Sequence, residues 1–215
     1  MRVNGRRPPP EGTLIEPERD QVTVHGAHVQ PASRHRYLAL HKPVGLLVSA
    51  RDPQGRPTVF DLLAGETASG RLFAVGRLDV ATGGLLLLTD DGELANRLTH
   101  PRHKVAKEYL ARVTGTPSER DLRALRDGVE LDGRRTLPAE VELVERGGVS
   151  LLRLVIREGR YRQVRRMLEA VGHPVRELTR TAIGPVRLGR LRPGSWRRLR
   201  HAELEDLRRE VGLAP

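Results

Sequence analysis

Two short apolar segments in the middle of the chain flank a glycine-containing loop. Residues 72–75 read Leu-Phe-Ala-Val, and residues 85–88 are four consecutive leucines. A segment that is apolar at every position suits a strand buried on both faces of a sheet. The loop between them carries Asp79, and its glycines allow a tight turn or a close approach to a ligand. Asp79 is thus a carboxylate that a ligand could reach, although a lone Asp beside glycine is more often a turn or capping residue.

Alternating and continuous apolar positions predict further strands. In residues 107–113 the odd-numbered positions, among them Tyr109, share one face. Gly147 and Gly148 separate two apolar segments and indicate a hairpin. The strands expected in this way are residues 37–40, 46–49, 72–75, 85–88, 107–113, 141–144 and 149–156.

Capping residues and helical spacing predict three helices. The first opens at Asp90, with Glu93 at the capping-box position. The second begins after Ser118, and the third spans residues 161–171, where apolar side chains recur on one face. Because strands outnumber helices and hairpins recur, we expect an α+β domain built on a mixed, largely antiparallel sheet flanked by helices and loops.

Two domains of unequal size are expected. Residues 1–33 contain short β-prone pieces at 1–5, 12–15 and 21–25, too little chain for an independent core. Residues 30–36 are typical of a linker. The remaining 36–215 form the main domain.

Composition removes several classes of chemistry. The chain has no cysteine, which excludes disulfides, thiol catalysis and cysteine-ligated metals. It has no His-Glu-x-x-His, Walker loop or dinucleotide fingerprint, so we expect no metal and no nucleotide or other cofactor. No segment approaches the roughly 18 apolar residues of a membrane span, and no apolar signal segment opens the chain. We therefore expect a cytoplasmic protein without a membrane partner.

Positive charge is concentrated near the end of the chain. Residues 153–200 contain fourteen Arg, no Lys and three Glu, a balance equal to the net charge of +11 of the whole chain. A solvated surface usually mixes signs and uses Lys freely, whereas guanidinium groups bind phosphate in a bidentate manner. The cluster therefore predicts a polyanionic partner, with nucleic acid favoured.

Three motifs, in this order, resemble those of one enzyme family. Residues 76–90 read Gly-Arg-Leu-Asp, then Thr-Gly-Gly, four leucines and Thr-Asp. Lys107-Glu108-Tyr109 follows, and residues 158–167 form a basic motif. Together they resemble the bacterial ribosomal RNA pseudouridine synthases of the RsuA-like family, and residues 178–197 resemble its RluB-like branch most. Residues 2–5 and 20–26 resemble the end of an alpha-L RNA-binding domain, which implies that residues 1–33 are a truncated remnant of one.

The resemblance implies a pseudouridine synthase fold and a role for each motif. Asp79 would be the catalytic carboxylate and act as the nucleophile, rather than being a turn residue. Arg77 would bind substrate, and Tyr109 would stack on the target base, whereas core packing with a bonded hydroxyl is the alternative. An ionised acid in a pocket needs a nearby cation, and Arg165 lies at the border of the apolar helix face, so we assign it as the partner of Asp79. The remaining basic residues, Arg160, Arg162 and Arg166, are assigned to RNA phosphates, although Arg166 could equally be solvated.

The function expected is isomerisation of a uridine to pseudouridine in ribosomal RNA, with the target flipped out of its stack. Large-subunit (23S) RNA is favoured over small-subunit (16S) RNA. The partner would be ribosomal RNA, free or in an assembly intermediate, and the protein a monomer. The main alternative is a non-catalytic rRNA-binding or ribosome-assembly factor, which the Arg cluster would suit equally. A DNA-binding regulator is disfavoured because no recognition helix is identifiable.

Overall fold

The computed structural model describes residues 1–13, 15, 20–29, 35–63 and 72–214. Contacts divide the chain into two units, Met1–His35 and Arg36–Pro215. The first unit holds a three-stranded antiparallel sheet of β1 (Arg2–Val3), β2 (Val22–Val24) and β3 (Ala27–Val29). The expected piece at 12–15 forms no strand at its described positions, and residues 30–34 of the expected linker lie outside the described chain. The alpha-L origin of this unit stays a prediction.

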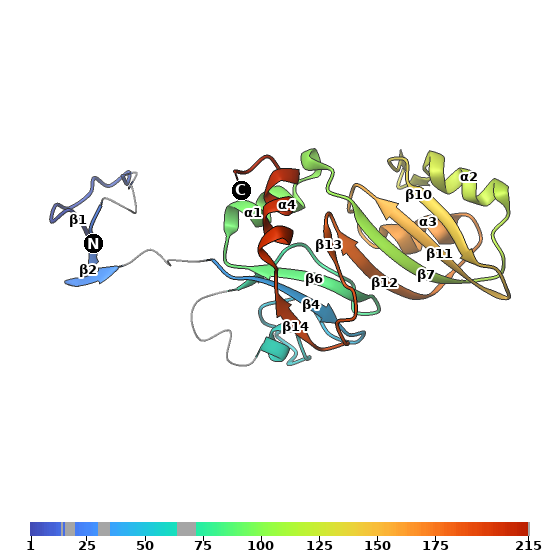
Figure 1. Cartoon of the computed structure of the whole chain (residues 1–215), viewed down its shortest axis with the longest axis horizontal. Coiled ribbons are helices and arrows are strands. Elements are labelled where there is room, and N and C mark those ends of the chain that lie inside the picture. Colours follow the sequence, from blue (N-terminus) through green and yellow to red (C-terminus); the bar gives the residue numbers. More distant parts are fainter. Residues whose placement is uncertain (14, 16–19, 30–34, 64–71, 215) are drawn as a thin grey trace. The chain divides into compact units, whose positions relative to one another are not determined.

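The second unit is built on a twisted sheet (Figure 1). Its main strand order is β10-β11-β7-β12-β6-β4-β14, with β13 beside β12 and β5 beside β6. Among the described residues, β12 and β6 form the parallel pair of this sheet and its other pairs are antiparallel, which confirms the mixed, largely antiparallel α+β prediction. The strands are β4 (Tyr37–Lys42), β5 (Phe73–Ala74), β6 (Gly83–Thr89), β7 (Lys107–Thr114), β10 (Glu140–Glu145), β11 (Val149–Ile156), β12 (Val175–Ile183), β13 (Val186–Arg187) and β14 (Trp196–Arg198).

Helices cover the two halves of this sheet separately. Helices α2 (Glu119–Asp127) and α3 (Gln163–Ala170) pack on the half made by β7, β10 and β11, in one hydrophobic cluster. Helices α1 (Gly92–Thr99) and α4 (His201–Glu210) lie side by side on the other half, in a second cluster (Figure 1). Shorter pieces are the 3₁₀ turns η1 (Val59–Leu63) and η3 (Pro101–His103) and the hairpin of β8 (Glu130–Leu131) and β9 (Arg134–Arg135).

Strand β6 is buried on both faces, as its four leucines predict. Leu85 and Leu87 join the cluster under α1 and α4, whereas Leu86 and Leu88 join a third cluster with η1. Every residue of β6 is buried. The loop that carries Asp79 therefore leads directly into the most enclosed strand of the sheet, which gives the loop a rigid end.

Strand β6 enters the sheet through a glycine that no other residue could replace without strain. Gly84 has φ +106°, and a Cβ built there would collide with the backbone of Arg180 on β12. Strained backbone and overpacking together predict that Gly84→Ala lowers the free energy of unfolding by roughly 3–5 kcal/mol. Gly133→Ala is the matched control, because φ is +70° there but a Cβ meets nothing within 4 Å.

Urea denaturation of both variants checks this prediction. Gly133→Ala reports the backbone term of about 1–2 kcal/mol, and Gly84→Ala should exceed it clearly. An equal loss in both variants would show that the contact between β6 and β12 tolerates a methyl group.

Two expected elements differ in the structure. Residues 46–49 are not a strand, because in the described chain only an isolated bridge joins Leu47 to Thr58. The third helix begins at Gln163 rather than at residue 161, since Arg162 takes a left-handed conformation with φ +48°. Tyr161 therefore lies in the turn before α3.

The first helix is capped one residue later than expected. Asp91, not Asp90, is the N-cap, and its Oδ1 accepts a hydrogen bond from the Leu94 backbone N–H at 3.0 Å. Asp90 instead forms an ion pair with Arg36 at 2.9 Å. Either aspartate can serve as an N-cap, but Asp90 is bound to Arg36 and Asp91 accepts the hydrogen bond from the first turn of α1. The N-cap expected at Ser118 is confirmed, and Asp121 completes a capping box with it.

Candidate active site

A cavity of about 380 Å³ opens beside the Asp79 loop. Its walls include the loop, strands β7 and β12, the turn that precedes α3 with the start of α3, and the segment from the end of α1 through η3. The cavity therefore lies over the centre of the sheet, where β7, β12 and β6 are neighbours. Chain segments distant in sequence converge there, as is typical of a binding site.

Asp79 lines this cavity with a half-buried side chain. Its backbone C=O accepts a hydrogen bond from the Thr82 N–H at 3.0 Å, which closes a turn. Within the described ranges its carboxylate has no hydrogen bond and no ion pair. The turn interpretation is thus correct for the backbone, but the turn does not use the side chain. The carboxylate is left available to a ligand.

Lys42, at the end of β4, is fully buried beneath this loop. Its Nζ donates to the backbone oxygens of Thr82 at 2.8 Å, Pro43 at 3.0 Å and Val80 at 3.3 Å. Burial lowers the pKa of Lys42 to about 8, and the nearby Asp79 carboxylate acts in the opposite direction. The ammonium group therefore holds the loop from below and supplies positive charge near Asp79.

Arg165 holds the same loop from α3. Its Nη2 donates to the Ala81 backbone oxygen at 2.7 Å, and its Nη1 donates to the Val175 oxygen at 3.3 Å. Burial lowers the pKa of Arg165, and so does Arg162, whereas Asp79 raises it. In the described chain no N–O contact of 4 Å or less joins Arg165 to Asp79. Lys42 and Arg165 together bind the three carbonyl groups that follow Asp79, and both act on its carboxylate through space.

Tyr109 forms part of the cavity wall on β7. Its side chain is only 8% exposed, and it lies opposite Arg180 of β12 in the strand register. None of the hydrogen bonds among described residues involves its hydroxyl. The alternative role, a core tyrosine whose hydroxyl is hydrogen-bonded, is therefore not supported by any hydrogen bond among the described residues. The ring borders the cavity instead.

The arginines assigned to substrate and phosphate differ in whether other described residues already bind their guanidinium groups. Arg77 and Arg162 line the cavity and have no side-chain partner among the described residues. Arg160 also lines the cavity, but its guanidinium donates to the backbone oxygens of Arg134 and Arg135 at 3.0 and 2.7 Å and pairs with Glu158. Arg166 lies outside the cavity lining and pairs with Asp132 at 2.6 Å.

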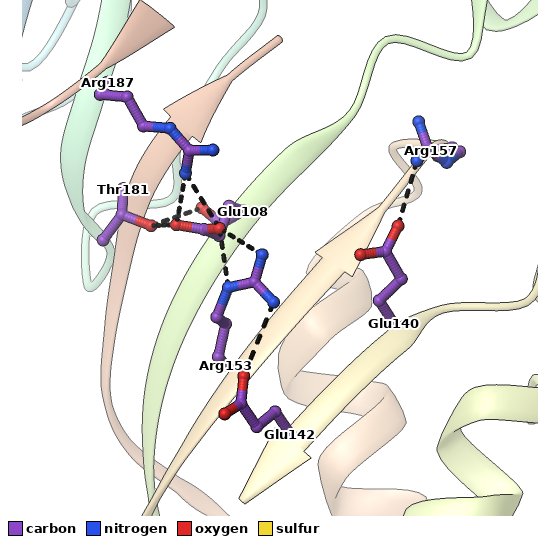
Figure 2. A network of polar contacts seen from close by, with 7 residues as sticks. All are labelled: Glu108, Glu140, Glu142, Arg153, Arg157, Thr181 and Arg187. Carbon is purple, nitrogen blue, oxygen red and sulfur yellow. Dashed lines mark hydrogen bonds and ion pairs between the residues drawn. The ribbon is translucent and has the colours of Figure 1, made fainter. Parts of the chain in front are cut away.

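A charged network fixes strand β7 from its other face (Figure 2). Glu108 accepts hydrogen bonds from Arg153 on β11, Thr181 on β12 and Arg187 on β13, at 2.8, 2.8 and 3.0 Å. Burial alone would raise the pKa of Glu108, but the hydrogen bonds from Thr181, Arg153 and Arg187 outweigh it and the pKa is lowered. Since neighbouring strand residues point to opposite faces, this network sets the position of Tyr109 in the cavity.

Sequence reasoning missed Lys42 as a functional residue. The signal was present, because Lys42 is one of three lysines in a chain with many arginines and it ends an apolar strand.

Among the described residues no group of three His, Asp or Glu side chains is arranged to hold a metal ion. No described helix is long and apolar enough to cross a membrane.

Comparison with known proteins gives one consistent family. The family of RNA pseudouridylate synthases matches residues 36–170. A protein of Aquifex aeolicus named as an uncharacterized RNA pseudouridine synthase is 44% identical over 99% of this chain and 85% of its own length. Ribosomal large subunit pseudouridine synthase B of Bacillus subtilis is 39% identical over 97% of this chain and 85% of its own.

A solved structure agrees with these sequence relatives. The crystal structure of a pseudouridylate synthase superposes with a TM-score of 0.76 at 35% identity, covering 96% of this chain and 87% of that one. The expected pseudouridine synthase fold is thereby confirmed. The chain belongs to the RNA pseudouridylate synthase family, a family of isomerases.

Proposed function

We propose that this protein converts a specific uridine of large-subunit ribosomal RNA to pseudouridine, with Asp79 as the catalytic residue. The observation that carries the proposal is the Asp79 carboxylate, which borders the cavity and has no hydrogen bond or ion pair with the described residues. The resemblance to large subunit pseudouridine synthase B supports the choice of RNA. The excess of arginine over residues 153–200 supports a polyanionic substrate.

The reaction needs no group from outside the substrate. The bond between N1 of uracil and C1′ of ribose breaks, the base rotates, and a bond forms between C5 and C1′. The hydrogen on C5 leaves as a proton, and N1 gains one. A carboxylate can serve as the nucleophile or as the proton acceptor in such a sequence. The Asp79 carboxylate, which no described residue binds, is available for either role.

The cavity suits a single nucleotide that has left its stack. Its volume of about 380 Å³ lies at the small end of the range of ligand pockets. Flipping a uridine out of folded RNA loses base stacking, and a stacked Tyr109 ring replaces part of it, ~1–3 kcal/mol per base. Arg77 lies two residues from Asp79 on the cavity wall, and because none of the described residues binds its guanidinium it can bind the phosphate or ribose of the same nucleotide.

Release of tritium from C5-tritiated uridine tests the proposal, because the isomerisation leaves the mass unchanged. We expect the protein to release tritium from an unmodified large-subunit rRNA transcript and not from a small-subunit transcript. Release from the small-subunit transcript alone would reassign the substrate. No release from either transcript would favour an RNA-binding assembly factor over an enzyme.

A further inference from the structure

The turn before α3, residues 158–162, is held rigidly at one lip of the cavity. The Glu158 carboxylate accepts hydrogen bonds from the Leu137 backbone N–H at 2.9 Å and from the Gln163 side chain at 2.6 Å. The Arg160 guanidinium is anchored to the hairpin of β8 and β9 through two backbone oxygens. These contacts use the side chains at positions 158, 160 and 163 and fix the backbone between them.

Two side chains of the same turn, those of Tyr161 and Arg162, form no hydrogen bond or ion pair with the described residues. Tyr161 is 76% exposed although it lines the cavity, and it belongs to none of the hydrophobic clusters. Arg162 lines the cavity too and, within the described chain, has no side-chain partner. The chain is only 3% aromatic, with three tyrosines, and both Tyr37 and Tyr109 are at least partly buried.

The backbone at Arg162 is itself unusual. Its φ of +48° is a left-handed conformation that residues other than glycine adopt at a cost. Such strain persists only where the surroundings impose it, and the anchored residues on either side do so here. The result is a pair of neighbouring side chains, one aromatic and one cationic, presented at the cavity lip on a fixed backbone.

We propose that Tyr161 and Arg162 bind the nucleotide next to the target uridine. When a base leaves its stack, its neighbour loses a stacking partner, and the exposed ring of Tyr161 replaces that partner. Arg162 binds the phosphate that links the two nucleotides, because a guanidinium group that no described residue occupies can bind phosphate in a bidentate manner. This inference rests on the proposed function, since it takes RNA as the substrate. It adds a second stacking position, distinct from the Tyr109 wall of the cavity.

Binding measurements with an Asp79→Asn parent separate the two contributions, because no turnover is intended in that background. The probe is the unmodified large-subunit rRNA transcript, titrated at several KCl concentrations. Tyr161→Ala should weaken binding about 5- to 160-fold without changing the salt dependence, because stacking involves no phosphate. Tyr161→Phe should bind much more like the parent, because stacking needs the ring and not the hydroxyl.

Arg162 should show the opposite signature. Arg162→Gln should reduce the slope of log affinity against log salt by ~0.7–0.9, as for one lost phosphate contact. Arg123→Gln on α2 is the matched control: it removes the same charge from an exposed side chain that does not line the cavity, and its slope should stay that of the parent. Arg162→Gly is a second variant that removes the same guanidinium. Glycine adopts a positive φ without strain, so this variant should keep the thermal stability of the parent protein.

The inference is overturned if Tyr161→Ala binds like the parent, or if Tyr161→Phe is as weak as Tyr161→Ala. It is also overturned if Arg162→Gln has the slope of the Arg123→Gln control. Failure of the proposed function would look different: the unmutated protein would release no tritium, while the binding measurements would still report on Tyr161 and Arg162.

Discussion

Asp79→Asn is expected to abolish isomerisation while leaving RNA affinity within a few-fold of the unmutated protein. Asparagine has nearly the same shape as aspartate, but its amide can act neither as a nucleophile nor as a proton acceptor. The Asp79 carboxylate has no hydrogen bond or ion pair with any described residue, so the substitution removes no polar contact among them. The cations and the Tyr109 ring that would hold the RNA remain in place.

Single-turnover tritium release and filter binding on the same transcript measure the two quantities. Thermal melting controls for the fold, and a shift of several degrees would make the variant unsuitable. Tritium release by Asp79→Asn at a rate near that of the unmutated protein would remove Asp79 from the chemistry. Loss of RNA binding as large as the loss of turnover would make it a binding residue instead.

Lys42→Met is expected to lower turnover by about 100-fold, with a much smaller effect on RNA affinity. Lys42 is absent from the cavity lining, yet it binds two of the three carbonyl groups that follow Asp79. Methionine fills similar space but donates no hydrogen bond, so the loop loses its support from β4. A misplacement of about 1 Å at a reacting group can cost 10²-fold in rate. Unimpaired turnover would show that Arg165 holds the loop without help.

The pH dependence of turnover provides a second test of the role of Lys42. Burial lowers the pKa of Lys42 from 10.5 to about 8, so in the folded protein the proton leaves as the pH rises through 8. A neutral amine has two N–H groups for three carbonyl oxygens, and turnover should therefore fall above pH 8.

Stability should move in the opposite direction over this range. Between pH 8 and 10.5 the unfolded chain keeps the proton that the folded chain has lost. The unmutated protein therefore gains stability relative to Lys42→Met as the pH rises through this window. Denaturant titrations of both proteins at pH 7 and pH 9.5 test it, and a constant difference would mean that Lys42 does not titrate there.

Local patterns predicted the strand on either side of Asp79 well, for physical reasons. Four consecutive leucines can be buried on both faces, and the two hydrophobic clusters that contact β6 show why no polar position interrupts them. Spacing alone could not tell a turn aspartate from a catalytic one, because Asp79 closes a turn with its backbone in either case. The prediction that Asp79 is catalytic therefore rests on the resemblance to a family.

Long-range contacts were beyond prediction from local patterns. The helical wheel placed Arg165 at the border of its helix, but its contact with Ala81 depends on how α3 packs across the sheet. The basic motif predicts that Arg160 binds RNA phosphates, yet its guanidinium donates to backbone oxygens of the hairpin of β8 and β9. The burial of Lys42 depends on the loop that folds over it. In each case the partner is tens of residues away, so no local pattern reports it.

Mapping of pseudouridine in ribosomal RNA tests the central claim most directly. Three samples would be compared: RNA from cells that lack this protein, from the same cells supplied with it, and from cells supplied with Asp79→Asn at equal abundance. We predict one large-subunit position that is pseudouridine only in the second sample. Identical maps in all three samples, or a position restored equally by Asp79→Asn, would contradict the account.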